Sequence, residues 1–189
     1  MMKRAQEAGV LQLVSWDLRD WTYDRHKTTD DAPYGGGCGL VMKCEPIFEA
    51  TRAVLDETDI PREDTCVIFL APQGRLFNDD IASSLSKKKR MVFVCGHYEG
   101  IDERAYSLAD EVICLGDYVL TSGELAAMVV SDAVVRKLPG VLGAEGGAET
   151  ESFVEGLLEY PQDTRPAVFE GMEVPEVLLS GHHANIEAW

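Results

Sequence analysis

The sequence lacks several features that would assign it to a common class of protein. No stretch approaches the roughly 18 consecutive apolar residues of a transmembrane helix, and the first ten residues contain no apolar core of a secretory signal. No segment matches the glycine patterns of phosphate loops or dinucleotide-binding folds. We therefore expect a cytoplasmic protein with no membrane span, folded as one domain over residues 1–189.

Basic residues are also scarce. The chain has 17 Lys and Arg against 33 Asp and Glu, which gives a net charge of -16. This balance argues against a general nucleic-acid-binding surface, because phosphate contacts need clustered cations. The basic run Lys87–Arg90 follows a predicted helix. We favour solvated cations at the helix C-terminus for this run, with contacts to RNA phosphates as the alternative.

The five cysteines form no C-x-x-C pair. Cys66, Cys95 and Cys114 lie inside apolar runs, which favours buried thiols over zinc or redox sites. His182 and His183 are adjacent, but neighbours in sequence do not share a helix face, and no third ligand is evident. We therefore predict no metal site.

Short apolar runs alternate with segments of helical periodicity. We expect strands over residues 12–16, 66–71, 91–95 and 111–115, and helices over 46–55, 78–86 and 102–108. A further helix is expected to begin at Thr121, which is spaced from Glu124 as in a capping box, and to end at Pro139 and Gly140. This alternation predicts an α/β fold with a mostly parallel sheet and helices on both faces.

Ligands of such sheets bind beside the loops that leave the carboxyl ends of the strands. Three of these loops contain glycine: 70–75 (LAPQGR), 96–104 (GHYEGIDER) and 115–124 (LGDYVLTSGE). Taken alone, the glycines are explained either by ordinary turns or by a small-ligand pocket lined with backbone groups.

The order of longer motifs is more specific. HKTTDDAPYGGGCGLVM, LAPQGR, CGHYEGIDER, GDYVLTSGELAAM, RKLPGVLG, EGLLEYPQDTRP and GMEVPEVLLSGHHANI follow one another across residues 4–189. This series resembles the tRNA (guanine-N1)-methyltransferase family, TrmD, whose members are SPOUT-class methyltransferases. The resemblance implies a C-terminal trefoil knot, S-adenosylmethionine as methyl donor and a homodimer whose active sites are shared between subunits. It also implies that the substrate is tRNA, methylated on N1 of the guanine immediately 3′ of the anticodon.

The resemblance assigns roles to residues in three groups. The first group is the catalytic pair, with Arg136 as an essential arginine and Glu151 as the general base. The target guanine is expected to meet Asp30, Tyr34, Gly35, Gly36, Gly37 and Gly39 of the facing subunit. The donor is expected to contact Leu70, Pro72, Gly96, Glu99, Leu115, Gly116, Asp117, Tyr118, Val119, Leu120 and Gly123.

The sequence departs from the family pattern in four ways. The family's opening strand and helix, and its C-terminal tRNA-binding domain, are expected to be absent. Glu151 replaces an aspartate, which extends the carboxylate by about one C–C bond, ~1.5 Å. His97 stands where arginine is common, and Ser122 where glycine is common. The two truncations and Glu151 leave open a truncated, non-catalytic homologue that dimerises and binds the donor only. A further alternative is another nucleotide-handling α/β protein that shares only the sheet pattern.

Overall fold

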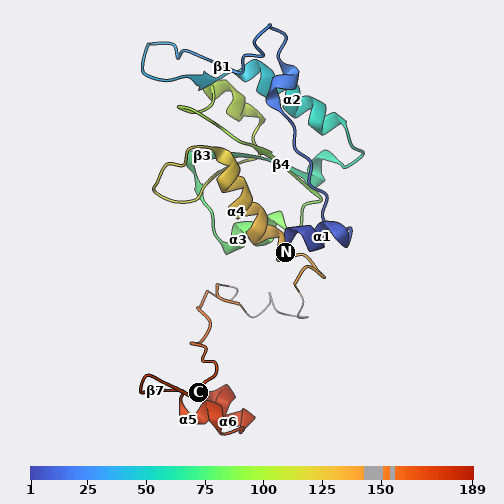
Figure 1. Ribbon diagram of the computed structural model, residues 1–189. Helices are drawn as coiled ribbons and strands as arrows, with labels where there is room; N and C mark the ends of the chain where they lie inside the picture. The colour runs from blue at the N-terminus through green and yellow to red at the C-terminus, as the bar shows by residue number, and fades with distance from the viewer. Residues whose placement is uncertain (143–150, 154–155) are drawn as a thin grey trace. The chain divides into compact units, whose positions relative to one another are not determined.

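The first of two compact units is built on a three-stranded parallel sheet. The computed structural model describes residues 1–142, 151–153 and 156–189, and the units are Met1–Glu149 and Thr150–Trp189. The sheet has the order β4-β3-β5, with β3 (Thr65–Leu76) in the centre, β4 (Arg90–Val94) on one side and β5 (Glu111–Cys114) on the other (Figure 1). The predicted parallel α/β sheet is confirmed.

The central strand is apolar on both faces because helices cover both. Cys66, Ile68 and Leu70 pack towards α3 (Asp79–Leu85) and α4 (Gly123–Val135). Val67 and Phe69 alternate with them and pack on the opposite side, with α2 (Cys44–Asp56) and the 3-10 helix η3 (Glu103–Leu108). This alternation follows from the two-residue period of a strand. Because β3 pairs with β4 and β5 in parallel, all three strands have their carboxyl ends at one edge of the sheet.

The two predicted helix starts have different outcomes. The Asn78 side chain caps α3 by accepting a hydrogen bond of 3.0 Å from the N–H of Ile81, as expected. The capping box at Thr121 is wrong: α4 has Ser122 as its N-cap, with no side-chain cap, and the Glu124 carboxylate pairs with His97. The helix also ends earlier than predicted, with Arg136 as its C-cap.

The predicted strand over residues 12–16 is also wrong. This segment has no regular structure, and Leu13, Val14 and Trp16 are exposed. A strand needs a neighbour to pair its backbone groups, and the part of the chain that is described offers none there. The segment connects α1 (Met2–Glu7) to the 3-10 helix η1 (Leu18–Trp21).

Smaller elements complete this unit. The strands β1 (Asp30–Asp31) and β2 (Val41–Met42) form an antiparallel pair that closes the glycine-rich segment into a hairpin. The 3-10 helix η2 (Arg62–Asp64) leads into β3. No helix in residues 1–142, 151–153 and 156–189 is long and apolar enough to cross a bilayer.

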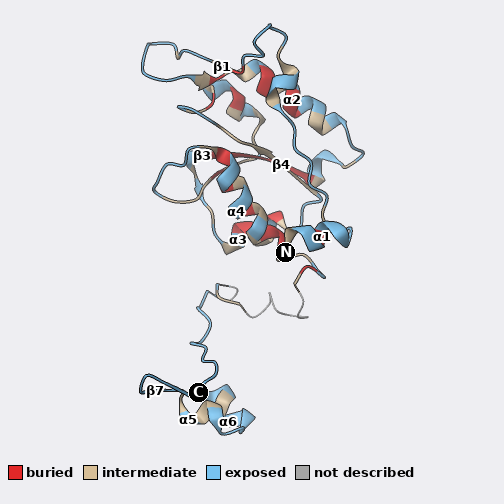
Figure 2. Cartoon of the chain, viewed as in Figure 1, coloured by how far each residue is buried: buried red, intermediate tan, exposed pale blue. Residues whose placement is uncertain are grey.

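The helix α4 carries a second apolar face. Ala126, Val130 and Val134 pack on the sheet, whereas Leu125, Met128 and Val129 are exposed, with Met128 at 67%. Buried and exposed segments alternate along α4 in Figure 2. A fully solvated helix face is normally polar. This apolar face is therefore suited to an interface.

The second unit has no buried residue among those that are described. It contains the hairpin of β6 (Val168–Phe169) and β7 (Met172–Glu173), followed by α5 (Glu176–Leu179) and α6 (His183–Ala188). Leu157, Leu158, Phe169 and Trp189 are among its exposed apolar side chains. The expected knot and the expectation of a single domain remain predictions.

Candidate functional site

A cleft of about 400 Å³ lies at the carboxyl edge of the sheet. Its walls come from the end of β3, from the loop after β4 and from the loop between β5 and α4. The structure brings the three glycine-containing segments of the sequence to one cavity. The prediction that residues 70–75 form a loop is wrong, because β3 continues to Leu76 and pairs with β5 across this segment. The volume lies in the usual range of small-molecule sites, roughly 300–1,000 Å³.

Most of the residues expected to meet the donor line this cleft. They are Leu70, Pro72, Gly96, Glu99, Leu115, Gly116, Tyr118, Val119, Leu120 and Gly123. Asp117 is not among the lining residues. Their role in binding remains a prediction, because a lining position does not identify the ligand.

Some lining residues were missed in the sequence. Tyr106 reaches the cleft from η3 and packs against Phe69, with ring centroids 5.1 Å apart. Gln73 lines the same wall and hydrogen-bonds to Tyr106. Nothing in the sequence marked Tyr106 as a cleft residue, because a tyrosine in a short helix is compatible with many environments. Gln73 lies within the LAPQGR motif, which could have marked it.

The loops approach each other closely at glycine positions. The N–H of Gly123 donates a hydrogen bond of 2.8 Å to the carbonyl of Gly96. A Cβ atom on Gly123 would lie 2.8 Å from Cα of Cys95, so this position excludes a side chain. Glycine is therefore needed here for close packing of α4 on the β4 loop, rather than for an unusual backbone angle.

The glycine hairpin begins at the rim of the cleft. Its base is held by three backbone hydrogen bonds: Met42 N–H to the Gly100 carbonyl (2.9 Å), Asp102 N–H to the Met42 carbonyl (2.9 Å) and Glu99 N–H to the Leu40 carbonyl (3.1 Å). Asp30 lies in β1, and Tyr34 near the tip is fully exposed at 101%. Gly35, Gly36, Gly37 and Gly39 all have positive φ angles. The hairpin therefore presents an accessible tip from an anchored base, as a substrate-binding loop would.

The side chains of His97 and Glu124 are within hydrogen-bond distance of each other at the cleft. Nε2 of His97 lies 2.8 Å from Oε1 of Glu124. Burial opposes ionisation of Glu124, but hydrogen bonds from Ser122 and His97 outweigh it and hold the pKa of this carboxyl below its usual value. Both sequence departures near the site, His97 and Ser122, therefore contact the same carboxylate.

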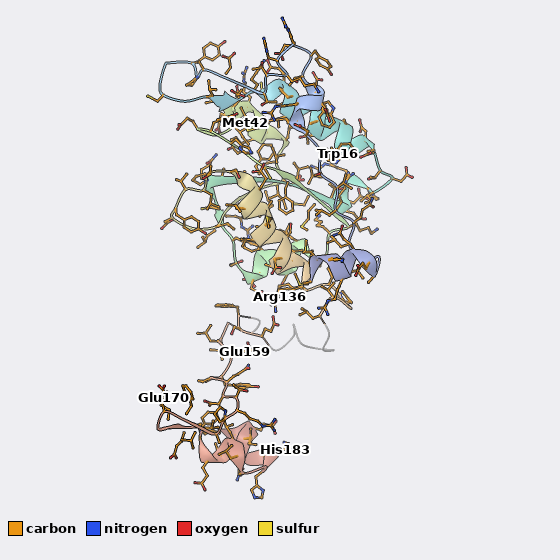
Figure 3. The ribbon with its side chains drawn as sticks, in the orientation of Figure 1. Trp16, Met42, Arg136, Glu159, Glu170 and His183 are labelled. Carbon is orange, nitrogen blue, oxygen red and sulfur yellow. The ribbon has the colours of Figure 1, made fainter. Side chains whose placement is uncertain are left out.

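Arg136 lies at the opposite end of α4 from the cleft. The N-terminal residue Gly123 lines the cleft, whereas Arg136 follows the last residue of this 13-residue helix (Figure 3). At 1.5 Å per residue the separation is roughly 20 Å. Arg136 is half-buried there. A single chain therefore does not bring this arginine to its own cleft.

Glu151 belongs to the second unit and is half-buried. Residues 143–150, which connect it to Arg136 and Pro139, lie outside the described part of the chain. Its expected role as a base remains a prediction.

The basic run Lys87–Arg90 binds acceptors of the protein itself. Lys88 Nζ donates to the carbonyl of Glu63 (2.6 Å), and Lys89 pairs with Asp64 (2.8 Å). Arg90 donates to the carbonyls of Val54 and Leu55 at the end of α2. These contacts favour a structural role for the run over contacts to RNA phosphates. The cations bind neighbouring elements of the protein, whereas the sequence predicted that they remain solvated.

Of the three cysteines predicted to be buried, Cys66 is buried, whereas Cys95 and Cys114 are only partly buried. Burial raises the pKa of Cys66 and of Cys95 to about 11, so both remain protonated at neutral pH. Cys38, in the glycine hairpin, is exposed. Among the described residues, no group of three or more His, Cys, Asp and Glu side chains is arranged to hold a metal ion.

Comparison with known proteins identifies consistent relatives. The family model described as tRNA (Guanine-1)-methyltransferase TrmD matches residues 1–189. A tRNA (guanine-N(1)-)-methyltransferase of Carboxydothermus hydrogenoformans is 55% identical over 190 residues, covering 100% of this chain and 73% of that protein. A protein of the same name from Dictyoglomus turgidum is 52% identical, over 100% of this chain and 75% of its own length. Another from Chloroflexus aggregans is 56% identical, over 100% of this chain and 73% of its own length.

Proposed function

Because this chain belongs to the tRNA (guanine-1)-methyltransferase TrmD family, we propose that its cleft binds S-adenosylmethionine and that the glycine hairpin of the facing subunit meets the target guanine. The chain is a methyltransferase that acts on N1 of guanine in tRNA. The finer proposals are that the target is the guanine immediately 3′ of the anticodon and that the reaction takes place in the cytoplasm.

The observation that carries the donor proposal is that the end of β3 and two loops meet at one cleft. Its walls combine apolar side chains such as Leu115 and Val119 with backbone groups next to Gly96 and Gly116. Apolar walls cover the faces of an adenine ring, and backbone amides and carbonyls hydrogen-bond to its edge. The absence of a phosphate-loop motif fits a nucleoside donor that carries no phosphate.

The proposed chemistry needs two further groups. When bound, the donor supplies a methyl group from its sulfonium. Guanine N1 carries a proton at neutral pH, so a carboxylate at Glu151 accepts that proton during transfer. Such a base contributes roughly 10²–10⁴-fold to the rate. The Arg136 guanidinium stabilises negative charge on guanine O6.

Two observations support a homodimer with shared sites. Arg136 lies roughly 20 Å along α4 from the cleft of its own chain, so a catalytic role needs a cleft from another subunit. The exposed apolar face of Leu125, Met128 and Val129 lies on the same helix. A second copy that covers this face would remove apolar surface from water. The C-terminal trefoil knot belongs to the same proposal.

Donor binding and methyl transfer test these proposals separately. We expect S-adenosylmethionine to bind the wild-type chain in calorimetry and labelled methyl to pass to tRNA. Leu120→Arg places a long cation in the cleft and should abolish both, because Leu120 lines the cavity and is partly exposed. Leu13→Arg is the matched control at an exposed position distant in sequence from the three loops.

The outcomes separate the alternatives. Donor binding without methyl transfer at high enzyme concentration would support the non-catalytic homologue. Absence of donor binding would overturn the assignment of the cleft.

A further inference from the structure

The acidic side chains of the cleft are not matched by lysine or arginine. Its lining carboxylates are Glu99 and Glu103, and no lysine or arginine of the described ranges is a lining residue. Buried apolar residues such as Ile113 and Ala126 belong to the same lining. A cleft that has charges of one sign and apolar walls concentrates the electric field of those charges. The cleft is therefore suited to a ligand with a net positive charge.

Glu103 lies in the wall that η3 contributes. It is the first residue of this helix, and Tyr106, three residues later, lines the same cleft. Side chains three residues apart in a 3-10 helix lie on the same face. Burial raises the pKa of Tyr106, and the negative charge of Glu103 adds to this effect against a hydrogen bond from Gln73. Tyr106 and Gln73 are therefore neutral, and Glu103 carries the charge of this wall.

The basic side chains near Glu103 are bound to other carboxylates. Nε and Nη2 of Arg104 donate hydrogen bonds of 2.9 and 2.7 Å to Asp102. Nε2 of His97 lies 2.8 Å from Oε1 of Glu124. Glu103 is exposed, and exposed carboxylates are ionised at neutral pH. Neither of these basic side chains is therefore placed to neutralise Glu103.

We propose that Glu103 makes the cleft selective for the cationic methyl donor over its neutral product, with Glu99 as a second charge of the same sign. The inference rests on the proposed function, because it takes S-adenosylmethionine as the ligand of the cleft.

The charges of the two ligands give the selectivity a direction. S-adenosylmethionine carries a sulfonium, an ammonium and a carboxylate, so it is a net cation. When the methyl group leaves, the electron pair of the broken C–S bond stays on sulfur. The product, S-adenosylhomocysteine, is therefore a thioether without net charge. Methyl transfer thus removes the charge that Glu103 attracts, which favours exchange of the product for fresh donor.

The size of the effect follows from the exposure of Glu103. Solvent screens an exposed charge, so we expect one such carboxylate to change the affinity for a cation by about two- to fivefold. The screening distance in salt falls from about 10 Å at about 0.1 M to about 3 Å at about 1 M. The preference for the donor should therefore decrease as ionic strength rises.

The test is calorimetry with S-adenosylmethionine and S-adenosylhomocysteine at neutral pH. The ratio of the two dissociation constants measures the preference, and the wild type should bind the donor more tightly. Glu103→Gln removes the charge, keeps the shape and should lower the ratio by about two- to fivefold. Glu103→Asp keeps the charge and should retain most of the preference. Sinefungin, which has a protonated amine in place of the sulfonium, should follow the donor in each variant.

Two further variants separate the local charge from other causes. Glu63→Gln removes the same charge from an exposed position in η2, which leads into the amino end of β3 rather than to the cleft. It should leave the ratio unchanged, although it changes the net charge equally. Tyr106→Phe removes a neutral hydroxyl from the same wall and should change the affinities for donor and product by the same factor.

The outcomes are distinct. If Glu103→Gln keeps the wild-type ratio, or if Glu63→Gln lowers it as much, the inference is wrong. A wild-type ratio that does not fall with added salt also contradicts it, and this measurement needs no variant to fold. If the wild type binds none of the three ligands, the proposed ligand of the cleft fails instead.

Discussion

A Cβ atom on Gly39 would lie 2.5 Å from Cγ of Glu99, because the hairpin backbone packs directly against that side chain. Glu99 also lines the cleft. The contact thus connects the loop proposed to meet guanine with the cavity proposed to hold the donor. A substitution in the hairpin can therefore test whether a change in that loop alters donor binding in the cleft.

Gly39→Ala should weaken donor binding by about tenfold, which corresponds to about 1.4 kcal/mol. The added methyl group forces Glu99 away from its position in the cleft wall. Gly36→Ala is the matched control: its φ of +80° is close to the +83° of Gly39, but a Cβ there has nothing within 4 Å. Both variants share the cost of an alanine at positive φ, about 1–2 kcal/mol. Equal losses of donor affinity in calorimetry would show that the Glu99 contact is not the cause.

Met128→Asp should convert the proposed dimer into a monomer. The charge would lie in the middle of the exposed apolar face of α4, where burial of an unpaired carboxylate is unfavourable. Sedimentation analysis measures the change. Val14→Asp, at an exposed apolar position outside α4, should leave the mass unchanged. A wild-type monomer at all accessible concentrations would contradict the proposed assembly.

Mixing two inactive variants should restore activity if the sites are shared. Arg136→Ala leaves the cleft intact, and Leu120→Arg leaves Arg136 intact. In a mixed dimer, one cleft is complete when the arginine comes from the partner. Statistical assembly would then give about a quarter of the wild-type methyl transfer to tRNA. If the mixture stays inactive while mixed dimers form, the arginine does not act across the interface.

Glu151→Gln should reduce methyl transfer by roughly 10²–10⁴-fold and leave donor binding unchanged, because the amide cannot accept the N1 proton. Glu151→Asp keeps the carboxylate and should retain measurable activity. Glu159→Gln, at an exposed glutamate of the same unit, is the control. Single-turnover transfer of labelled methyl provides the rate, and an unchanged rate in Glu151→Gln would remove this residue from the mechanism.

Asp110 should stabilise the fold in a pH-dependent manner. Its carboxylate accepts hydrogen bonds of 2.7 Å from Arg62 and from the N–H of Val67. Burial opposes ionisation, but these partners outweigh it and lower the pKa of Asp110. A depressed folded-state pKa stabilises the protein above the unfolded value, about 3.9, and this contribution is lost as pH falls through the folded value.

Asp110→Asn should therefore lower the free energy of unfolding by about 1 kcal/mol at neutral pH, a value reduced because the side chain is 36% exposed. The difference from wild type should shrink in acid. Urea denaturation at fixed protein concentration measures both values, with the exposed Asp59→Asn as control. A difference independent of pH would point to lost packing rather than lost charge.

Local sequence patterns predicted the elements that depend on near neighbours. The apolar run Cys66–Ala71 forms the buried part of β3, and Asn78 caps α3 through a residue three positions away. The prediction failed for residues 12–16 and for the capping box at Thr121. In both cases the outcome depended on a distant partner, namely a neighbouring strand in the first and His97 in the second.

The sequence by itself determined the parallel α/β pattern, the family and the three glycine-containing segments that form the cleft, although the first of them is the end of β3 rather than a loop. Short-range periodicity and motif order carry that information. Only the tertiary structure decided that His97 pairs with Glu124, that Gly39 packs on Glu99 and that Arg136 lies away from its own cleft. These facts depend on how segments distant in sequence pack together and on the length of α4, and no local pattern specifies such contacts.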